Sequence, residues 1–203
     1  GLGHAVRASP SLNAAVATGM PEIDPIIIAI AHYAVALLFL SSAYAKATNY
    51  AVFRATLAEY ELLPQALAGF AAIVFAAVEV LIGVAALFAA TAAFAMFAAA
   101  ILLCVYALAI GINLARGRRD IDCGCTGPAT RQLLSGWLLV RNAGLVAFAA
   151  IGAMAPTGRA LLMADWVVVG LGLTAVVTLY AAINQLLANV PRLDALDAVM
   201  DSA

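Results

Sequence analysis

The sequence is almost entirely apolar from residue 67 to residue 115, and this stretch constrains the fold more than any other feature. At about 1.5 Å per residue, a helix of roughly 49 residues is far too long for one membrane crossing, which takes about 20. The stretch must therefore turn back on itself, and we expect the turn near Ala89, Ala90 and Thr91. No glycine or proline marks that position.

The composition indicates that lipid is the main solvent of this chain. Of its 203 residues, 66% are hydrophobic and 10% are charged, and the mean hydropathy is +1.06. Because soluble domains carry about 25% charged residues, this chain cannot cover itself with polar side chains. The net charge of −1 also argues against a nucleic-acid partner.

Five apolar runs are long enough to cross a bilayer. Lipid permits only helices or closed barrels, and uninterrupted runs exclude the alternating strands of a barrel, so each run predicts a helix. We expect an all-α integral membrane bundle at residues 23–190, with tails at 1–22 and 191–203. The expected spans are about 25–45, 67–89, 92–115, 133–154 and 166–187.

Basic residues divide unequally between the two sides of the predicted bundle. Side A, which holds the N-terminal tail, carries two of them, Arg7 and Arg159. Side B, which holds the loops after the first and third spans and the C-terminal tail, carries seven: Lys46, Arg54, Arg116, Arg118, Arg119, Arg131 and Arg192. By the positive-inside rule, this difference places side B in the cytoplasm.

Two cysteines one residue apart, Cys123 and Cys125, lie in the loop between the third and fourth expected spans. We expect Thr130 to cap the fourth helix, so that both sulfurs precede a helix N-terminus. That end of a helix, together with Arg119 and Arg131, favours the thiolate form. A disulfide between such close cysteines would close a strained ring that is easily reduced, which suits exchange better than permanent cross-linking.

The cysteine pair has two other interpretations. It could be chemically inert, or it could supply half of a zinc site. Structural zinc sites usually space paired cysteines by two to four residues and need two further ligands, and the only histidines, His4 and His32, are distant in the sequence. We therefore expect no metal. The third cysteine, Cys104, lies within an expected span and is expected to be a small buried apolar residue.

Residues that lipid tolerates poorly fall at a similar depth in four of the expected spans. His32, Glu79, Cys104 and Arg141, which is followed by Asn142, all lie roughly 16–20 Å from side B. Ionisable residues at this depth usually face the bundle interior and pair, so we expect Glu79 to pair with Arg141, with His32 nearby. This buried polar cluster would either fix helix register or form a proton path or a polar wall for a quinone head group.

The loop after the first span predicts an amphipathic helix on side B. Apolar side chains follow helical spacing between residues 51 and 63, with Tyr50 and Tyr60 as expected interfacial anchors. Lys46, at the membrane boundary, is expected to extend its ammonium group to water. Such a helix would lie near the cysteine loop, where it could cover the thiols or dock a partner.

Together these motifs resemble the MauE family of methylamine-utilisation membrane proteins, within the broader DoxX-like group. Their order is SSAYAKATN, YELLP, DIDCGCTG and WLLVRNAGL. The likeness covers residues 25–152, and its strongest elements are Cys123, Gly124 and Cys125 with Gly127, and Trp137 with Arg141 and Asn142. The resemblance implies a four-helix DoxX/MauE-like core with a fifth C-terminal transmembrane helix, in a bacterial inner (cytoplasmic) membrane.

The resemblance also implies a redox function. MauE proteins are associated with maturation of methylamine dehydrogenase, whose small subunit is rich in disulfides, and they act beside a thioredoxin-like partner. The chain would then be a thiol–disulfide oxidoreductase or relay in which Cys123 and Cys125 exchange. By analogy with vitamin K epoxide reductase, a quinone is a candidate acceptor, although this chain lacks shuttle cysteines in its first loop. A periplasmic partner would place side B outside, against the charge count.

Two other classes of function fit the sequence. A bundle rich in alanine and glycine packs well against neighbours and could be a structural or accessory subunit of a larger membrane complex. A small-solute transporter built on the buried charges is a third interpretation. The lack of internal repeats and of broken helices disfavours it.

Overall fold

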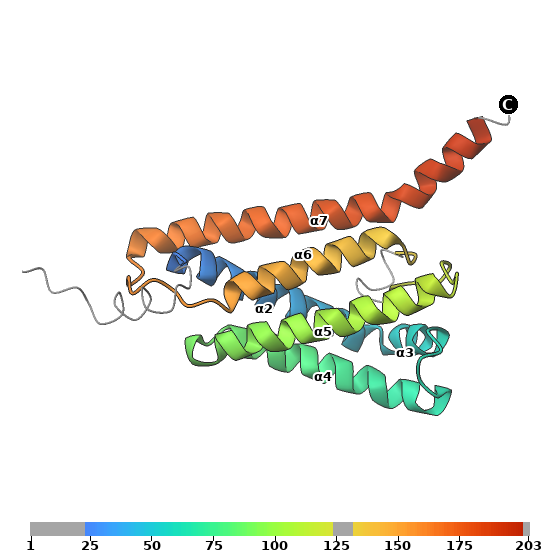
Figure 1. The fold of residues 1–203 in the computed structure, drawn as a ribbon, viewed down its shortest axis with the longest axis horizontal. Coiled ribbons are helices and arrows are strands. Elements are labelled where there is room, and N and C mark those ends of the chain that lie inside the picture. Colours follow the sequence, from blue (N-terminus) through green and yellow to red (C-terminus); the bar gives the residue numbers. More distant parts are fainter. Residues whose placement is uncertain (1–22, 124–131, 201–203) are drawn as a thin grey trace, which may run out of the picture.

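The computed structural model describes residues 23–123 and 132–200, and the regular elements in these ranges are helices. The long helices lie side by side in one bundle (Figure 1), so the predicted all-α membrane bundle is confirmed. The predicted N-terminal tail, Cys125, Thr130 and Arg131 lie outside the described residues. The helices are α2 (Pro25–Thr48), α3 (Tyr50–Glu59), the 3-10 helix η1 (Gln65–Leu67), α4 (Ala68–Ala86), α5 (Ala89–Ala115), α6 (Gly136–Gly152) and α7 (Met163–Met200).

Most of these helices are long and apolar enough to cross a membrane. Four segments meet that standard, namely α2, η1 with α4, α5, and α7 as far as Leu186. The fifth, α6, is apolar but has 17 residues, which rise only about 25 Å. Large apolar side chains such as Phe70, Phe94 and Trp137 are exposed on the outside of the bundle, where lipid can solvate them. The chain is a multi-pass membrane protein.

Several helix boundaries differ from the expected spans. The turn expected at Ala89 lies two residues earlier, at Leu87 and Phe88, and α5 begins at Ala89. Thr91 marks this turn after all, because its hydroxyl donates a hydrogen bond to the Ala85 carbonyl at 2.7 Å. At the other end of the chain, α7 continues to Met200, and its last part bends away from the bundle (Figure 1).

The fourth span begins later than expected because residues 132–134 pair in antiparallel fashion with residues 121–123, and these two paired segments are called the hairpin. The Cys123 N–H donates to the Gln132 carbonyl at 2.8 Å, and the Leu134 N–H donates to the Ile121 carbonyl at 3.0 Å. These bonds hold the backbone in extended form, so α6 starts only at Gly136. The expectation that the sulfurs directly precede a helix N-terminus is therefore wrong for Cys123.

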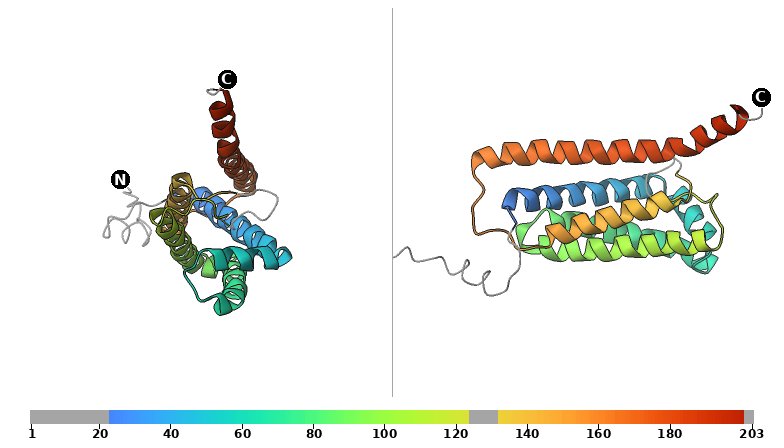
Figure 2. Two further views of the ribbon diagram at one scale, coloured as in Figure 1. Left: turned by 90° about the vertical axis from the view of Figure 1, so that its right-hand side faces the viewer. Right: turned by 45° about the horizontal axis from the view of Figure 1, so that its top comes forward.

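Helix α2 is central to the bundle. It packs against α4, α5, α6 and α7, while α5 packs against α4 and α6. Glycines permit close approach at two of these contacts: a Cβ atom at Gly83 would lie 2.7 Å from Leu40 Cγ, and one at Gly172 would lie 2.5 Å from Ile30 Cδ1. Figure 2 shows the other long helices gathered on one side of α7. The result is the expected four-helix core with an additional, peripheral fifth helix.

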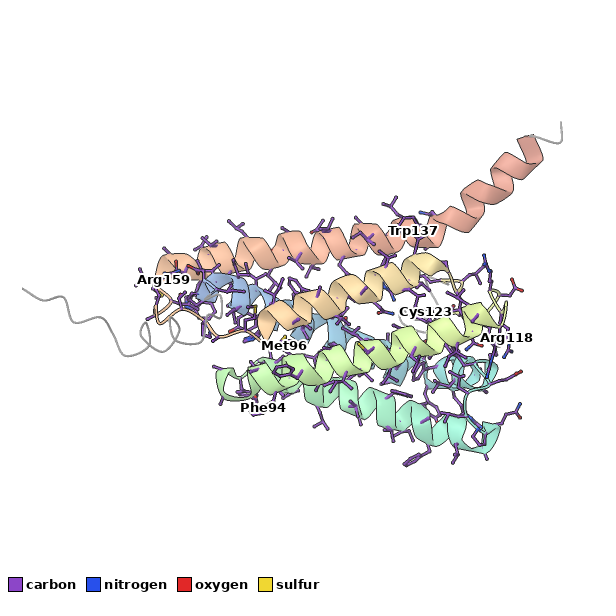
Figure 3. The ribbon with its side chains drawn as sticks, viewed as in Figure 1. Phe94, Met96, Arg118, Cys123, Trp137 and Arg159 are labelled. Carbon is purple, nitrogen blue, oxygen red and sulfur yellow. The ribbon has the colours of Figure 1, made fainter. Side chains whose placement is uncertain are left out.

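The two ends of the bundle are built differently. On side A, Arg159 joins the N-terminal ends of two helices by bonding to Asp165 at 2.7 Å and to Asp24, the N-cap of α2, at 3.2 Å. The hydrogen bonds to Asp165 and Asp24 raise the pKa of Arg159 above its ordinary value. Side B holds α3 and the hairpin, with Arg118 and Cys123 toward this end in Figure 3. The candidate site belongs to side B.

Candidate functional site

Cys123 is fixed by backbone and side-chain contacts on side B. Cys123 is buried, with 7% of its surface exposed. The Cys123 N–H donates to the Gln132 carbonyl across the hairpin, and the Tyr60 hydroxyl donates to the Cys123 carbonyl at 3.5 Å. The Sγ atom lies 3.8 Å from Nη2 of Arg141. A cation beside sulfur favours the thiolate, which is the nucleophilic form.

Arg141 joins three elements around this sulfur. Its Nη1 donates to Gln132 Oε1 at 3.0 Å and to Asn184 Oδ1 at 2.9 Å. Gln132, which is 1% exposed, in turn donates from Nε2 to the Asn184 carbonyl at 3.1 Å. The hairpin, α6 and α7 thus meet at one guanidinium. Sequence reasoning missed Gln132 and Asn184, although an asparagine inside the apolar run of α7 was a usable signal.

Glu79 pairs with Lys46, so the expected Glu79–Arg141 ion pair is wrong. The Lys46 ammonium bonds to Oε1 of Glu79, and the two side chains are 4% and 1% exposed. Oε1 also accepts hydrogen bonds from Ser42 Oγ at 3.1 Å and from the Tyr106 hydroxyl at 2.8 Å. Because Ser42 and Lys46 are one turn apart on α2, both reach the same carboxylate on α4. Lys46 therefore does not extend to water as expected.

His32 does not join this cluster. Its Nε2 lies 2.8 Å from the carbonyl of Gly152, which is the last residue of α6 on side A. Ten residues of helix, about 15 Å, separate His32 from Ser42. The expected polar cluster of four residues is thus divided. Glu79, Arg141 and Asn142 line one cavity, and His32 lies elsewhere.

The remaining predicted residues have mixed outcomes. Arg119 is exposed. Cys104 is also exposed on the outside of α5, contrary to the expected burial. The amphipathic helix is present as α3, but Tyr60, expected at the interface, is 7% exposed and packs near Cys123. Within residues 23–123 and 132–200, no group of three His, Cys, Asp or Glu side chains could hold a metal ion.

Three adjoining cavities surround these side chains. The sulfur cavity, about 220 Å³, is lined by Cys123, Tyr60, Lys46 and Tyr106 among others. The polar cavity, about 210 Å³, is lined by residues that include Ser42, Glu79, Tyr106, Arg141 and Asn142. The lipid groove, about 510 Å³, lies between α2, α6 and α7 and includes Ser41, Arg141, Gly144 and Tyr180. Tyr106 is shared by the first two cavities, and Arg141 is shared by the last two.

Comparison with known proteins gives a consistent result. The family profile described as "Methylamine utilisation protein MauE" matches residues 24–155. The methylamine utilization protein MauE of Paracoccus denitrificans is 35% identical over 127 residues, which are 63% of this chain and 68% of that protein. The protein of the same name from Methylorubrum extorquens is 38% identical over 130 residues, or 64% and 69% of the two chains. No solved structure matches this chain.

Proposed function

Because this chain belongs to the MauE family, we propose that it is a membrane-embedded thiol–disulfide redox protein that serves methylamine utilisation. Its partner would be a thioredoxin-like protein, as in the maturation of a disulfide-rich periplasmic dehydrogenase. The observation that carries the proposal is the contact between Cys123 Sγ and the Arg141 guanidinium at 3.8 Å. A sulfur beside a partly buried cation is placed for reactivity rather than for packing alone.

The proposed reaction is an exchange between two cysteines of this chain and a disulfide of the partner. The Cys123 thiolate attacks one partner sulfur, which forms a mixed disulfide and releases the other partner sulfur as a thiolate. Cys125 then attacks Cys123 Sγ, so that the partner leaves as a dithiol and a Cys123–Cys125 bond remains. Two electrons and two protons pass to the partner. The same steps in reverse oxidise it.

The proposed location is a bacterial inner membrane, with side B facing the periplasm. Disulfide chemistry belongs to oxidising compartments, of which the periplasm is one. The burial of Lys46 weakens the charge count that opposes this orientation, because an ammonium group paired with Glu79 inside the bundle no longer counts among the loop charges of side B.

Thiol labelling tests the proposal directly. In a Cys104→Ala background, which removes the exposed third thiol, the purified protein is treated with a maleimide polymer before and after dithiothreitol. We expect labelling of Cys123 and Cys125 only after reduction, and re-formation of the bond with oxidised thioredoxin. Cys123→Ser and Cys125→Ser are the matched controls, each leaving one thiol. The exchange function is wrong if both thiols label fully before reduction and resist mild oxidation.

A second function, as an accessory subunit of a larger membrane complex, is favoured by one observation. Only 6% of the apolar window of α7 is buried within the chain, which leaves a long helix face for a neighbouring protein. The double variant Cys123→Ser/Cys125→Ser separates the two functions. An accessory subunit would keep its role in dehydrogenase maturation and co-purify in a fixed ratio, whereas a redox protein would lose that role.

A further inference from the structure

We propose that the polar cavity and the lipid groove form one binding site for a lipid-soluble quinone. The quinone ring would occupy the polar cavity, and its isoprenoid tail would lie in the groove between α2, α6 and α7. The electron step of this proposal rests on the proposed thiol function. The binding site itself rests on separate observations.

The polar cavity contains a hydrogen-bond donor and an acceptor that are both unused. Asn142, 2% exposed, and Glu79, 1% exposed, line it. Within the described part of the chain, Asn142 Nδ2 and Glu79 Oε2 have no hydrogen-bond partner. Buried polar atoms are costly without partners. The cavity, at about 210 Å³, far exceeds the ~30 Å³ share of one water molecule, so it fits a ring with polar substituents.

A quinone satisfies both atoms across its two redox states. The carbonyl oxygen of the oxidised ring accepts a hydrogen bond from Asn142 Nδ2. A hydroxyl of the reduced ring donates one to Glu79 Oε2. A lipid phosphate fits less well, because the carboxylate of Glu79 lines the same cavity. The chemistry of the cavity therefore favours a ring that accepts a hydrogen bond in its oxidised state and donates one in its reduced state.

The groove supplies the space for an apolar tail. It is lined mainly by aliphatic and aromatic side chains of α2, α6 and α7 and has a volume of about 510 Å³. It shares Leu38, Ser41, Arg141, Leu145 and Tyr180 with the polar cavity. A molecule with one small polar end and one long apolar end matches this shape, with the polar end inward.

Arg141 connects this site with the sulfur. It lines both the polar cavity and the groove, and its Nη2 is 3.8 Å from Cys123 Sγ. In the proposed step, the reduced Cys123 and Cys125 give two electrons and two protons to the quinone. One disulfide and one hydroquinone result. The reverse step would reduce the disulfide.

Equilibrium binding of radiolabelled ubiquinone-1 to the full chain in nanodiscs tests the polar cavity. We expect saturable binding that weakens about tenfold in Asn142→Leu. The matched control is Asn113→Leu: Asn113 is also fully buried, its Oδ1 also lacks a partner among the described residues, and it lines neither the polar cavity nor the groove. Equal affinity of the two variants for ubiquinone-1 would overturn the assignment of the quinone ring to the polar cavity.

A substitution that fills the groove tests whether the isoprenoid tail binds there. A Cβ atom at Gly144 or at Gly111 would meet nothing within 4 Å, but only Gly144 lines the groove. Gly144→Leu is therefore expected to weaken ubiquinone-1 binding about tenfold, with the thermal midpoint kept. Gly111→Leu is expected to leave binding unchanged. Wild-type affinity in Gly144→Leu would overturn the groove as the tail site.

Two measurements on the unmutated chain separate this inference from the proposed function. Exchange of Cys123 and Cys125 with thioredoxin, without saturable ubiquinone-1 binding, would overturn the quinone site and leave the thiol function standing. Saturable binding without thiol exchange would overturn the electron step and the thiol function together. If both hold, mixing the reduced chain with ubiquinone-1 should consume two thiols for each hydroquinone formed.

Discussion

The side-B half of the bundle contains two buried polar clusters whose compositions differ. In the first, Lys46 and Glu79 are oppositely charged and neutralise each other between α2 and α4. In the second, the contacts described for Arg141 go to neutral amide oxygens of Gln132 and Asn184 and to a cysteine sulfur. The Lys46–Glu79 pair holds α2 against α4 through Oε1 of Glu79, while Oε2 of the same carboxylate stays open to the polar cavity. A cation beside a thiol changes the reactivity of that thiol.

A place inside the bundle therefore does not by itself show what a charged side chain of this membrane protein does. The first cluster lies between apolar helices, the second joins α6 and α7 to the hairpin, and both are held by hydrogen bonds. They differ in the chemistry of the partners. We expect substitutions in the first cluster to change stability, and substitutions in the second to change thiol chemistry.

Replacing Glu79 should have the largest effect on stability. Glu79→Leu leaves the Lys46 ammonium buried without its carboxylate, and losing one partner of a buried pair typically costs about 3–5 kcal/mol. The double variant Lys46→Met/Glu79→Leu should lose less, because no charge remains unpaired. Unfolding in mixed micelles, followed by circular dichroism, measures both. A double variant less stable than Glu79→Leu would show that the pair does more than neutralise itself.

Replacing Gly83 should have the next largest effect, because a larger side chain at this position would push α4 away from α2, the two helices that carry the first cluster. The added Cβ atom would lie 2.7 Å from Leu40 Cγ and 3.3 Å from the Ala36 carbonyl oxygen. Gly83→Ala is therefore expected to cost about 1–3 kcal/mol as overpacking. Gly111→Ala, where nothing lies within 4 Å, is the control and should be neutral or slightly stabilising. Equal stabilities would contradict the close α2–α4 contact.

Replacing Arg141 should change reactivity more than stability. With Cys104 and Cys125 replaced, Arg141→Gln is expected to slow alkylation of Cys123 by iodoacetamide about tenfold at constant pH, because it removes the cation that favours the thiolate. Local unfolding would instead expose the sulfur and speed the reaction. Arg119→Gln is the control and should have no effect, since Arg119 is exposed. A slower reaction in Arg119→Gln alone would restore the role first expected for that residue.

Replacing Tyr60 should have the smallest effect. Tyr60→Phe removes only the hydroxyl that donates to the Cys123 carbonyl at 3.5 Å, which is worth about 0.5–1.5 kcal/mol. Tyr50→Phe removes a bond to the Gly69 carbonyl at 3.2 Å in an exposed setting and should cost less. The same unfolding assay compares them. A larger cost for Tyr50→Phe would mean that α3 is held mainly at its other end.

The sequence predicts the helices well because length and hydropathy decide membrane spans. It also indicates a polar layer, because charged residues in apolar runs are conspicuous. It could not predict which of these residues meet, since that depends on how each helix is rotated. Lys46 and Arg141 were both possible partners for Glu79, and only the packing of α2 on α4 selects Lys46.

The late start of α6 could not be predicted for a different reason. Residues 132–134 are compatible with the beginning of an apolar helix. Their hydrogen bonds to residues 121–123 come from a part of the chain whose pairing no local pattern shows. This pairing places Cys123 beside Arg141 and moves the sulfur away from the helix N-terminus expected to activate it.

The shortness of α6 has a consequence for access to the sulfur. A rise of about 25 Å is less than the hydrocarbon thickness of about 30 Å, whereas the neighbouring α5 has 27 residues. Such hydrophobic mismatch is relieved by local thinning of the bilayer. The membrane surface should therefore dip around the hairpin, and a water-soluble protein that reacts with Cys123 must approach among the lipid head groups. Bilayers of longer acyl chains should hinder that approach.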